Sequence, residues 1–437
     1  MPDNYNMNDT YKNLLKRVKG DHYIWGCVTL LAVFSMLIVY SATGSLAYKM
    51  NNGNTELYLI KQFIFILIGF ALIYVLHKLN YVIFSKIAII LYAISLPLLL
   101  YTLFFGAEIN SGVRWIKIPV INMTFQTSDF AKLALYMYLS RQLSRKQEDD
   151  KIKDFKKGFL PVFIPIVLTC GLILPANLSN ALLTGLTSML LLFIGRVKYK
   201  HIFMIIGVAL IPILIIVGVA VGTYNPDIEH LENKSNARIE SATSENSIFK
   251  RFSTWVSRVQ DYLYAKGDDV PYQVQQSRIA IANGSVFFGL GPGNSEQRNY
   301  LPQAYNDFIY SIIIEEYGLL GASFIIFIYL VFLFRCIRIF RKCPGAFGAF
   351  LALGLSFTLV IQAVSNMAVN VGLIPVTGVT LPLVSMGGSS FLFTCASIGI
   401  ILSVSRYVEL NVKTNLENEG DAVAEARPLI EAEQVEK

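Results

Sequence analysis

PYQVQQSRIAIANGSVFFGLGPGNSEQRNYLPQAYNDF, residues 271–308, is the stretch around which the chain is organised. It is dense in Gly, Asn and Gln and is too polar to lie in lipid, although the chain around it is very apolar. It ends in an acid, Asp307, which we expect on the first turn of a membrane helix. Because a carboxylate at a bilayer edge is costly unless it is used, we expect the remaining segments to hold this stretch at the outer face of a membrane.

The composition indicates an all-α polytopic membrane protein. The 437 residues are 54% hydrophobic and only 15% charged, whereas about a quarter of the residues in a soluble protein are charged. The net charge of +7 has two explanations, an anionic partner or an excess of Lys and Arg in cytoplasmic loops. The distribution of charges along the chain favours the second, and no nucleic-acid partner is expected.

Apolar windows of about 20 residues predict ten transmembrane helices, of which the fourth is short and polar for a span. They lie near 23–44, 58–77, 82–105, 127–141, 158–175, 178–195, 202–222, 307–334, 346–369 and 389–407. The predicted organisation is a cytoplasmic N-terminal segment (1–22), one ten-helix membrane domain (23–408) and an acidic cytoplasmic tail (409–437). The tail has few aromatic residues, so we expect it to be disordered.

Positive charge alternates between the connecting segments. Clusters of Lys and Arg lie in the N-terminal segment and after the fourth, sixth and eighth spans. The positive-inside rule therefore places both termini in the cytoplasm and a large loop, residues 223–306, outside the cell between the seventh and eighth helices. Within this loop, residues 243–265 have apolar side chains at helical spacing, which predicts an amphipathic helix along the outer surface.

Cysteine and histidine usage predicts neither disulfides nor a metal site. The five cysteines fall in predicted spans or at cytoplasmic ends, and the large outer loop contains none. The four histidines are scattered without the spacing of metal ligands.

Asp307 is the first candidate for chemistry. In LPQAYNDF, Asn306 is a plausible N-cap, so Asp307 would lie in the first helical turn. An acid there could complement the helix dipole or could act in a reaction, and both readings stay open. Ser311 and Glu315 follow on the same predicted face, while Glu316 points away.

A second group of polar residues lies in SGVRWIKIPVINMTFQTSDFAKLALY, residues 111–136. It comprises Arg114, Trp115 and Lys117 in an outward loop, and Ser128, Asp129 and Lys132 on a helix that begins near Thr127. Asp129 and Lys132 share a helix face and could simply neutralise each other. Alternatively, Arg114 and Lys132 could form a cationic site for a phosphate group, to which Arg251 of the outer loop could add.

A third group, GLIPVTGVTLPLVSMGGSS at 372–390, breaks a span. The breaking residues are Pro375, Gly378, Pro382, Gly387 and Gly388. Irregular backbone at membrane depth is tolerated where it is buried in protein or lines a wet cavity. Ser385, Ser389 and Ser390 could therefore hydrogen-bond either a polar ligand or the freed backbone groups.

The glycines of the opening stretch resemble a phosphate-binding loop only superficially, because no strand precedes them and no P-loop pattern is matched. They are Gly284, Gly289, Gly291 and Gly293. Together with Tyr272, Gln273, Gln276 and Ser277 they indicate a lid, residues 272–299, folded over a polar head group.

These patterns together resemble the SEDS family of shape, elongation, division and sporulation proteins, which includes FtsW and RodA. The family's R-W and F-Q-P-S-E-x-A-K are similar to Arg114-Trp115 and FQTSDFAK at 125–132. Its Y-Q-x-x-Q-S and G-x-G-x-G-N-S are similar to Tyr272-Gln273, Gln276-Ser277 and GLGPGNS at 289–295. Its L-P-E-A-H-T-D-F is similar to LPQAYNDF at 301–308, and its P-x-x-G-x-x-x-P-x-x-S-x-G-G-S is similar to PVTGVTLPLVSMGGS at 375–389. The resemblance extends over roughly residues 20 to 408.

The resemblance implies a peptidoglycan glycosyltransferase that polymerises lipid II at the outer face of the bacterial inner membrane during cell division. Asp307 would be the general base, and undecaprenyl pyrophosphate the leaving group. Arg114, Lys132 and Arg251 would stabilise the pyrophosphate, with a divalent cation such as Mg or Mn as a candidate cofactor. The implied partners are a class B penicillin-binding protein and other divisome proteins.

The chain departs from the family pattern at three places. Thr127 and Asp129 replace the usual Pro and Glu, and Tyr305 and Asn306 replace the usual His and Thr before the acid. The family's Q-P-D-x-G reads LPANLSNALL at 174–183, without an acid. Because the Asp307 region is intact, we interpret that acid as dispensable here. Its absence also favours FtsW over RodA.

Two other classes of function remain open. Ten spans with broken helices and a polar cleft would also suit a lipid II flippase or another transporter. The polar groups, however, cluster at the predicted outer edge rather than at mid-membrane, which favours chemistry on a lipid head group. The third class is a non-catalytic divisome scaffold that activates a partner transpeptidase.

Overall fold

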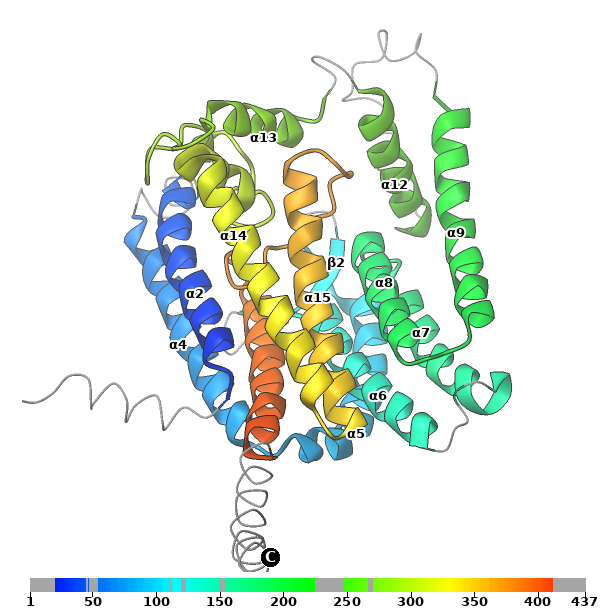
Figure 1. Cartoon of the computed structure of the whole chain (residues 1–437). Helices are drawn as coiled ribbons and strands as arrows, with labels where there is room; N and C mark the ends of the chain where they lie inside the picture. The colour runs from blue at the N-terminus through cyan, green and yellow to red at the C-terminus, as the bar shows by residue number, and fades with distance from the viewer. Residues whose placement is uncertain are drawn as a thin grey trace, which may run out of the picture.

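The computed structural model describes residues 20–44, 46, 54–109, 112–118, 123–148, 152, 154–224, 247–265 and 270–411. Within these residues, every one of the ten predicted spans corresponds to a helix of one bundle (Figure 1). The helices are α2 (His22–Ala42), α4 (Glu56–Lys78), α5 (Tyr81–Phe105), α6 (Thr127–Glu148), α7 (Leu160–Ile173), α8 (Leu178–Ile194), α9 (Tyr199–Gly222), α14 (Ile309–Lys342), α15 (Ala346–Asn370) and a C-terminal helix (Ser389–Asn411). A short π-helix, η2 (Phe155–Phe159), leads into α7.

Length and hydropathy explain why the fourth span was hard to define. Eight of the described helices, the one that begins at Phe155 being counted with α7, are long and apolar enough to cross a membrane. Helix α8 has 17 residues, and α6 contains several charges. The face of α6 that carries Leu135, Tyr136 and Leu139 is completely buried, in contact with α5, α7, α8 and α15. Protein rather than lipid surrounds α6, so its polar side chains can find partners.

A small antiparallel sheet replaces part of the predicted outward loop at 106–126, a feature that the all-α prediction missed. Its strands are β1 (Ala107–Ile109), β2 (Gly112–Ile118) and β3 (Met123–Gln126), in the order β1-β2-β3. Strand β2 is rich in β-branched and aromatic residues, which fit a strand, and Trp115 pairs with Gln126. Because α6 begins at Thr127, directly after β3, the sheet fixes where α6 starts.

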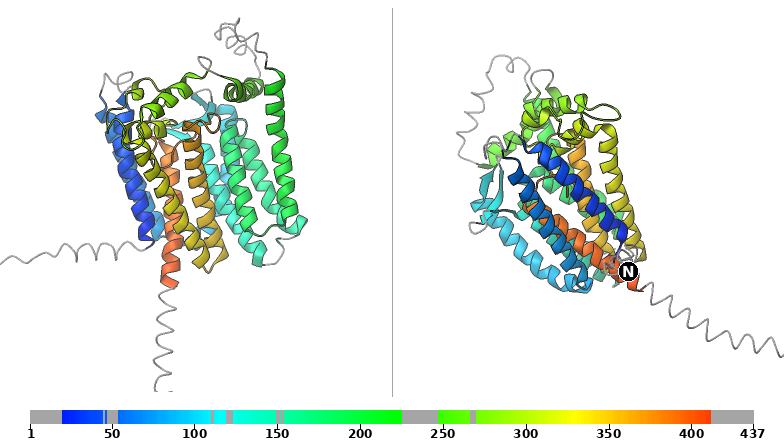
Figure 2. Two further views of the ribbon diagram at one scale, coloured as in Figure 1. Left: turned by 45° about the horizontal axis from the view of Figure 1, so that its top comes forward. Right: turned by 90° about the vertical axis from the view of Figure 1, so that its left-hand side faces the viewer.

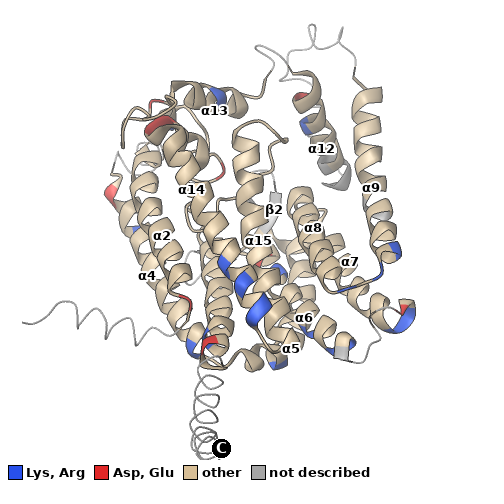
Figure 3. Ribbon diagram, viewed as in Figure 1, with Lys and Arg blue, Asp and Glu red and all other residues tan. Residues whose placement is uncertain are grey.

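The basic segments of the described chain gather at one end of the bundle (Figure 3). The C-terminal turns of α14 and α6 carry Arg341, Lys342, Arg145 and Lys146. Both ends of the described chain lie together, because the amide of Gly20 donates to the Glu409 carboxylate at 3.0 Å. Residues 1–19 and 412–437, which include most of the predicted terminal segments, lie outside the described residues.

The opposite end of the bundle carries α12 (Ser247–Tyr264), α13 (Tyr272–Asn283) and a 3₁₀ turn, η4 (Gln297–Asn299) (Figure 2). The amphipathic helix predicted at 243–265 is confirmed. Its apolar face, with Trp255 and Val256, packs against Ile216 and Ala220 of α9. The protein itself thus covers this face.

Helix α14 is bent at Gly318, where the backbone leaves the helical region with φ 65° and ψ −170°. The Tyr310 hydroxyl donates to the Ala322 carbonyl at 3.4 Å, although twelve residues of straight helix would separate these two positions by about 18 Å. The first turns therefore fold back on the rest. The predicted eighth span, 307–334, is consequently displaced, and the part of α14 that can cross a membrane is the straight helix after Gly318.

The glycine-rich part of the lid packs against this bend. The amides of Leu290 and Gly291 donate to the carbonyls of Glu315 and Glu316 at 2.8 and 2.9 Å, which satisfies acceptors that the bend frees from the helix. A Cβ at Gly289 would lie 2.3 Å from the Glu315 carbonyl oxygen. A side chain at this position would thus prevent the close approach of the two backbones.

Candidate functional site

Asp307 lies in a turn two residues before α14, whose N-cap is Phe308. The prediction that Asn306 caps the helix and that Asp307 occupies its first turn is therefore wrong. The backbone of Asp307 is held by two side chains of α15, because the amides of Asn366 and Asn370 donate to its carbonyl oxygen at 2.8 and 2.9 Å. This double contact fixes Asp307 at the level of the C-terminal end of α15.

A ladder of amide side chains on α15, which sequence reasoning missed, continues this contact. Gln362, Asn366 and Asn370 follow at four-residue intervals on one helix face. Asn366 also donates to the Val379 carbonyl at 2.7 Å, and Gln362 donates to the Thr380 carbonyl at 3.1 Å. Three amides at this spacing in an apolar span are a signal that could have revealed the ladder from the sequence.

Arg258 of α12 is a second residue that the sequence analysis missed. Its guanidinium donates to the Val376 carbonyl in the broken segment at 3.2 Å, and the charges of Asp307 and Asp261 act on it. Burial lowers the pKa of Arg258 and the two carboxylates raise it, so the side chain stays charged. The predicted Arg251 lies two helical turns earlier in α12, and its side chain is outside the described residues.

The turn before α14 and the broken segment carry further polar side chains. Burial raises the pKa of Tyr305, as do, to a smaller extent, Tyr58 and Asp307, so its hydroxyl stays protonated. Asn306 Oδ1 and Thr377 Oγ1 are buried and make no hydrogen bond within the described protein. Because buried polar atoms are nearly always satisfied, each of these two oxygens marks a place for water or a polar ligand.

The broken segment is confirmed, and it contacts the Asp307 turn as expected. Residues 371–388 form no helix, and Gly378 and Gly388 have positive φ values. Ser385 donates to the Asn306 carbonyl at 2.6 Å and accepts from the Leu381 amide at 2.8 Å. Ser385 therefore satisfies freed backbone groups. Pro375, Pro382 and Gly387 lie in the same irregular segment.

The Asp129–Lys132 group forms a closed cluster. Lys132 Nζ lies 2.7 Å from Asp129 Oδ1, and both side chains are about nine-tenths buried. Ser390 donates to Asp129 and to Gln126, and the amide of Gln126 donates to Ser389. The cavity beside the pair has a volume of about 20 Å³, which holds one water molecule and no sugar.

This cluster supports the simpler of the two sequence readings, a locally neutralised pair. Lys132 is charge-balanced by Asp129, and it reaches the amide ladder through Gln362 at 3.5 Å. A phosphate-binding role for Lys132 stays a prediction. Arg114 lies in β2 with its side chain outside the described residues, and Trp115 is half-buried.

The α13 residues of the lid divide into exposed and structural positions. Tyr272 is half exposed, and Gln273 and Gln276 are partly buried. Ser277 is buried, shares a hydrogen bond of 2.6 Å with Ser311 and donates to the Asn370 carbonyl at 2.9 Å. Ser277 thus joins α13 to α14 and α15, and its predicted contact with the substrate stays a prediction.

Glu315 and Glu316 are also structural. Both are buried, but they face different neighbours. Glu315 accepts from the amides of Glu296 and Gln297 at 3.2 Å each, whereas Glu316 accepts from Ser41 of α2. Glu315 thus binds the lid.

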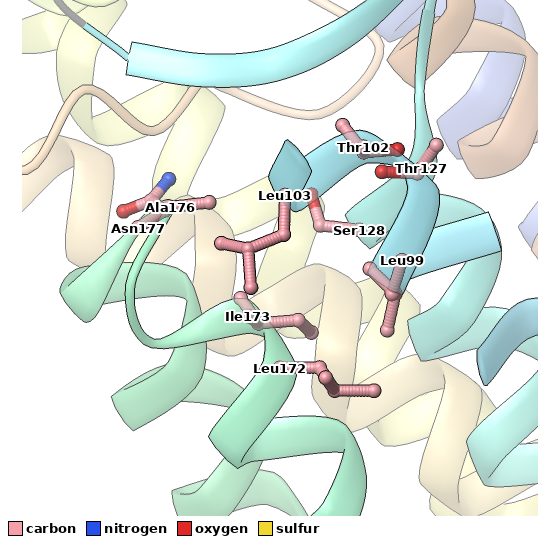
Figure 4. A pocket seen from close by; sticks show the side chains of 9 residues that line it. All are labelled: Leu99, Thr102, Leu103, Thr127, Ser128, Leu172, Ile173, Ala176 and Asn177. Atoms are coloured by element: carbon pink, nitrogen blue, oxygen red, sulfur yellow. The ribbon is translucent and has the colours of Figure 1, made fainter. Parts of the chain in front are cut away.

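The segment without the expected acid forms a helix cap. Asn177 is the N-cap of α8, and its Oδ1 accepts from the Asn180 amide at 3.2 Å. Asn caps a helix as well as Asp does. Asn177 also borders a cavity of about 10 Å³ between α5, α6 and α7 (Figure 4), which is too small for a substrate.

The described residues contain no group of three or more His, Cys, Asp or Glu side chains that could hold a metal ion. A divalent cation can also be held by one or two carboxylates together with substrate phosphates, so the predicted divalent cation stays a prediction.

Fold and site together define a polytopic helical membrane protein with a polar site at one face. The chain belongs to the cell cycle protein family of FtsW, RodA and SpoVE, because the sequence model of that family matches residues 21–410. The resemblance inferred from the motifs is thereby confirmed.

Curated relatives carry the name FtsW. The chain is 32% identical over 387 residues to the probable peptidoglycan glycosyltransferase FtsW of Trichlorobacter lovleyi, a match that covers 88% of the chain and 92% of the relative. It is 32% identical over 396 residues to the protein of the same name from Geobacter sp. strain M18, covering 90% and 98%. These names agree with the preference for FtsW over RodA.

Solved structures share the fold. A chain of a peptidoglycan synthase complex, studied for the coordination of polymerization and crosslinking, matches with a TM-score of 0.66 at 25% identity. The match covers 89% of this chain and 98% of that chain. The rod shape determining protein RodA of Thermus thermophilus matches with a TM-score of 0.59 at 22% identity, covering 89% and 97%, and supports the fold alone.

Proposed function

We propose that this protein is a peptidoglycan glycosyltransferase that polymerises lipid II into glycan strands during cell division. The observation that carries the proposal is the Asp307 turn. A carboxylate stands there between a charged Arg258 and two buried, unsatisfied oxygens, under a lid at the end of the bundle opposite the basic loops. Family membership and the FtsW relatives support the same activity.

In the proposed reaction, Asp307 takes the proton from the C4 hydroxyl of the acceptor N-acetylglucosamine. The oxygen attacks C1 of the donor N-acetylmuramic acid, and the new C1–O bond forms as the bond to undecaprenyl pyrophosphate breaks. The pyrophosphate leaves with the electron pair, so the anomeric configuration inverts. The two amides that hold the Asp307 backbone keep the base in place for this step.

Stabilisation of the leaving pyrophosphate falls first to Arg258. A guanidinium binds phosphate oxygens in a bidentate manner, and Arg258 is tied to the broken segment through Val376. Arg114, Arg251 and Lys132 stay candidates for the same task. The residues described do not by themselves fit a resident divalent cation, so the mechanism is derived without one, and chelation of metals would test that cofactor.

We assign the chain to the bacterial cytoplasmic membrane, with the basic end of the bundle and both termini in the cytoplasm. The similar chain from a peptidoglycan synthase complex supports a partner of the class B penicillin-binding protein type. Contacts with other divisome proteins belong to the same proposal.

The decisive experiment uses purified protein together with its cognate class B penicillin-binding protein, labelled lipid II and separation of the glycan products on a gel. The wild type should form long strands. Asp307→Asn, which keeps the shape of the side chain, should form none. Asp154→Asn serves as the control, because it makes the same change at an exposed N-cap carboxylate between α6 and α7.

Two results would contradict the proposal. Unchanged polymerisation by Asp307→Asn would remove the base assignment. Absence of polymer from wild type with its partner, together with measurable translocation of lipid II across vesicles, would favour the transporter, and absence of both activities would favour a scaffold.

A further inference from the structure

The tip of the lid loop exposes large apolar side chains. Val286, Phe287 and Phe288 are 65%, 66% and 78% exposed, and they follow one another directly in the sequence. A contiguous apolar patch of this kind marks an interaction surface. None of these three side chains has a role in the site around Asp307.

The tip is held rigidly on the bend of α14. Two amide–carbonyl hydrogen bonds, from Leu290 to Glu315 and from Gly291 to Glu316, fasten its end. A Cβ at Gly284 would lie 2.3 Å from the Ile314 carbonyl oxygen, so the backbones also touch at the start of the loop. The height of the tip in the molecule is therefore set by α14.

The length of α2 indicates where the bend of α14 lies relative to the membrane. Arg335 pairs at 2.5 Å with Asp21, the N-cap of α2, and Glu316 accepts from Ser41 at the opposite end of α2. The 21 residues of α2 span about 31 Å, close to the thickness of a bilayer's hydrocarbon core, about 30 Å. With Arg335 at the inner boundary, Glu316 lies at the outer boundary.

The loop tip lies at the same level. A Cβ at Gly318 would lie 2.7 Å from the Phe287 carbonyl oxygen, so Phe287 borders the bend directly. Below the bend, α14 exposes a continuous apolar stripe. The stripe comprises Leu319, Leu320, Phe324, Phe327, Leu330 and Phe334. A stripe of this length on a membrane-crossing helix faces lipid, and the tip extends it upward.

We propose that Val286, Phe287 and Phe288 insert into the outer leaflet at the boundary between head groups and acyl chains. Lipid is the occupant because the tip is continuous with a lipid-facing stripe and lies at the outer boundary of the hydrocarbon core. Aromatic side chains are favoured at this depth. The inserted tip anchors the bend of α14 and thereby sets the height of the half-helix that follows Asp307.

A fluorescence experiment tests the depth directly. Phe287→Trp is placed in a chain in which Trp25, Trp115 and Trp255 are replaced by Phe, and the protein is reconstituted into phosphatidylcholine vesicles. The lipids carry bromine near the head group or near the end of the acyl chain. Phe327→Trp, on the middle of the exposed stripe, is the matched control for deep burial in lipid.

For Phe287→Trp we expect quenching by shallow bromine to exceed quenching by deep bromine about twofold, since the ring lies at the interface. The order should reverse for Phe327→Trp. Iodide in the water should quench Phe287→Trp weakly. If the chain without native tryptophans does not fold, the same comparison is made as a difference between Phe287→Trp and the native protein.

Strong quenching by iodide without quenching by either brominated lipid would overturn the proposal. Protection from iodide that arises only when a penicillin-binding protein is added would also overturn it, since the surface would then bind protein. The measurement needs no catalysis, so its outcome is independent of the proposed glycosyltransferase activity.

Discussion

The polar groups around Asp129 and around Asp307 both contain a carboxylate, and they are built differently. In the Asp129 cluster, the charge is balanced by Lys132 at 2.7 Å, and Ser390 and Gln126 complete the contacts. Around Asp307, the backbone carbonyl of the acid accepts from two amides of α15, and the buried oxygens Asn306 Oδ1 and Thr377 Oγ1 make no hydrogen bond within the described residues. A saturated cluster stabilises a fold, whereas an unsaturated one has capacity left for a ligand.

The same amide ladder joins the two clusters, which makes the difference instructive. Gln362 contacts Lys132, and Asn366, one turn further along α15, contacts Asp307. Both carboxylates stand near the same end of the bundle. The presence of an acid at the edge of a membrane therefore does not by itself identify a catalytic group.

Asp307→Asn should separate the two clusters most clearly. We expect polymerisation to fall by about 10² to 10⁴, the usual contribution of a general base, with little change in thermal stability. Product gels and the unfolding temperature in detergent measure the two effects. A large loss of stability with retained activity would make Asp307 a structural residue like Asp129.

Asp129→Asn should show the opposite profile. It leaves Lys132 buried without its counter-charge, which costs about 3–5 kcal/mol of stability, measured as a lower unfolding temperature. The double substitution Asp129→Leu with Lys132→Met should recover most of this loss, because a buried pair can be replaced by apolar side chains of similar size. Equal stability of Asp129→Asn and wild type would show that the cluster is not saturated.

Arg258→Lys tests whether the Asp307 cluster needs a guanidinium. Lys keeps the positive charge but cannot bind phosphate oxygens through two parallel donors. We expect the rate of polymerisation to fall about tenfold in Arg258→Lys and further in Arg258→Met, since each good charged hydrogen bond is worth about 1.5–3 kcal/mol. The control is Arg278→Lys on the exposed face of α13, which should leave the rate of polymerisation unchanged.

Ser277→Ala should have the smallest effect. The hydroxyl joins α13 to Ser311 and Asn370, so its loss should cost about 1 kcal/mol of stability and shift the unfolding temperature slightly. If Ser277 instead bound substrate, as the sequence reading proposed, the KM for lipid II would rise without a change in stability.

Much of the fold could be predicted because lipid imposes a simple rule on the sequence. A lipid-facing span needs about 20 apolar residues and must satisfy its own backbone, and eight helices meet this rule. Helices α6 and α8 were predicted as well, although α6 is charged and α8 is short. The β1–β3 sheet was missed although its strands are neighbours in the sequence, whereas the bend at Gly318 was missed because it depends on contacts with the lid. Gly318 is bent because the lid supplies amides for the carbonyls of Glu315 and Glu316.

The site shows the same division. Asp307 and the broken segment were predicted, because an acid near a membrane edge and a run of Pro and Gly in a span can be recognised from neighbouring residues of the sequence. Arg258 and the ladder of Gln362, Asn366 and Asn370 were missed. Arg258 lies about 50 residues before Asp307 in the sequence. Its position relative to Asp307 depends on the packing of α12 against α9.

The sequence by itself determined that this protein is a membrane bundle of the FtsW, RodA and SpoVE family with an acid at position 307. Hydrophobic length, charge asymmetry and local motifs are sufficient for that, since each is a property of neighbouring residues. Only the tertiary structure decided which charged side chains lie close enough to act on one another. That choice depends on distances between helices, and Asp129 with Lys132, and Asp307 beside Arg258, are its two outcomes.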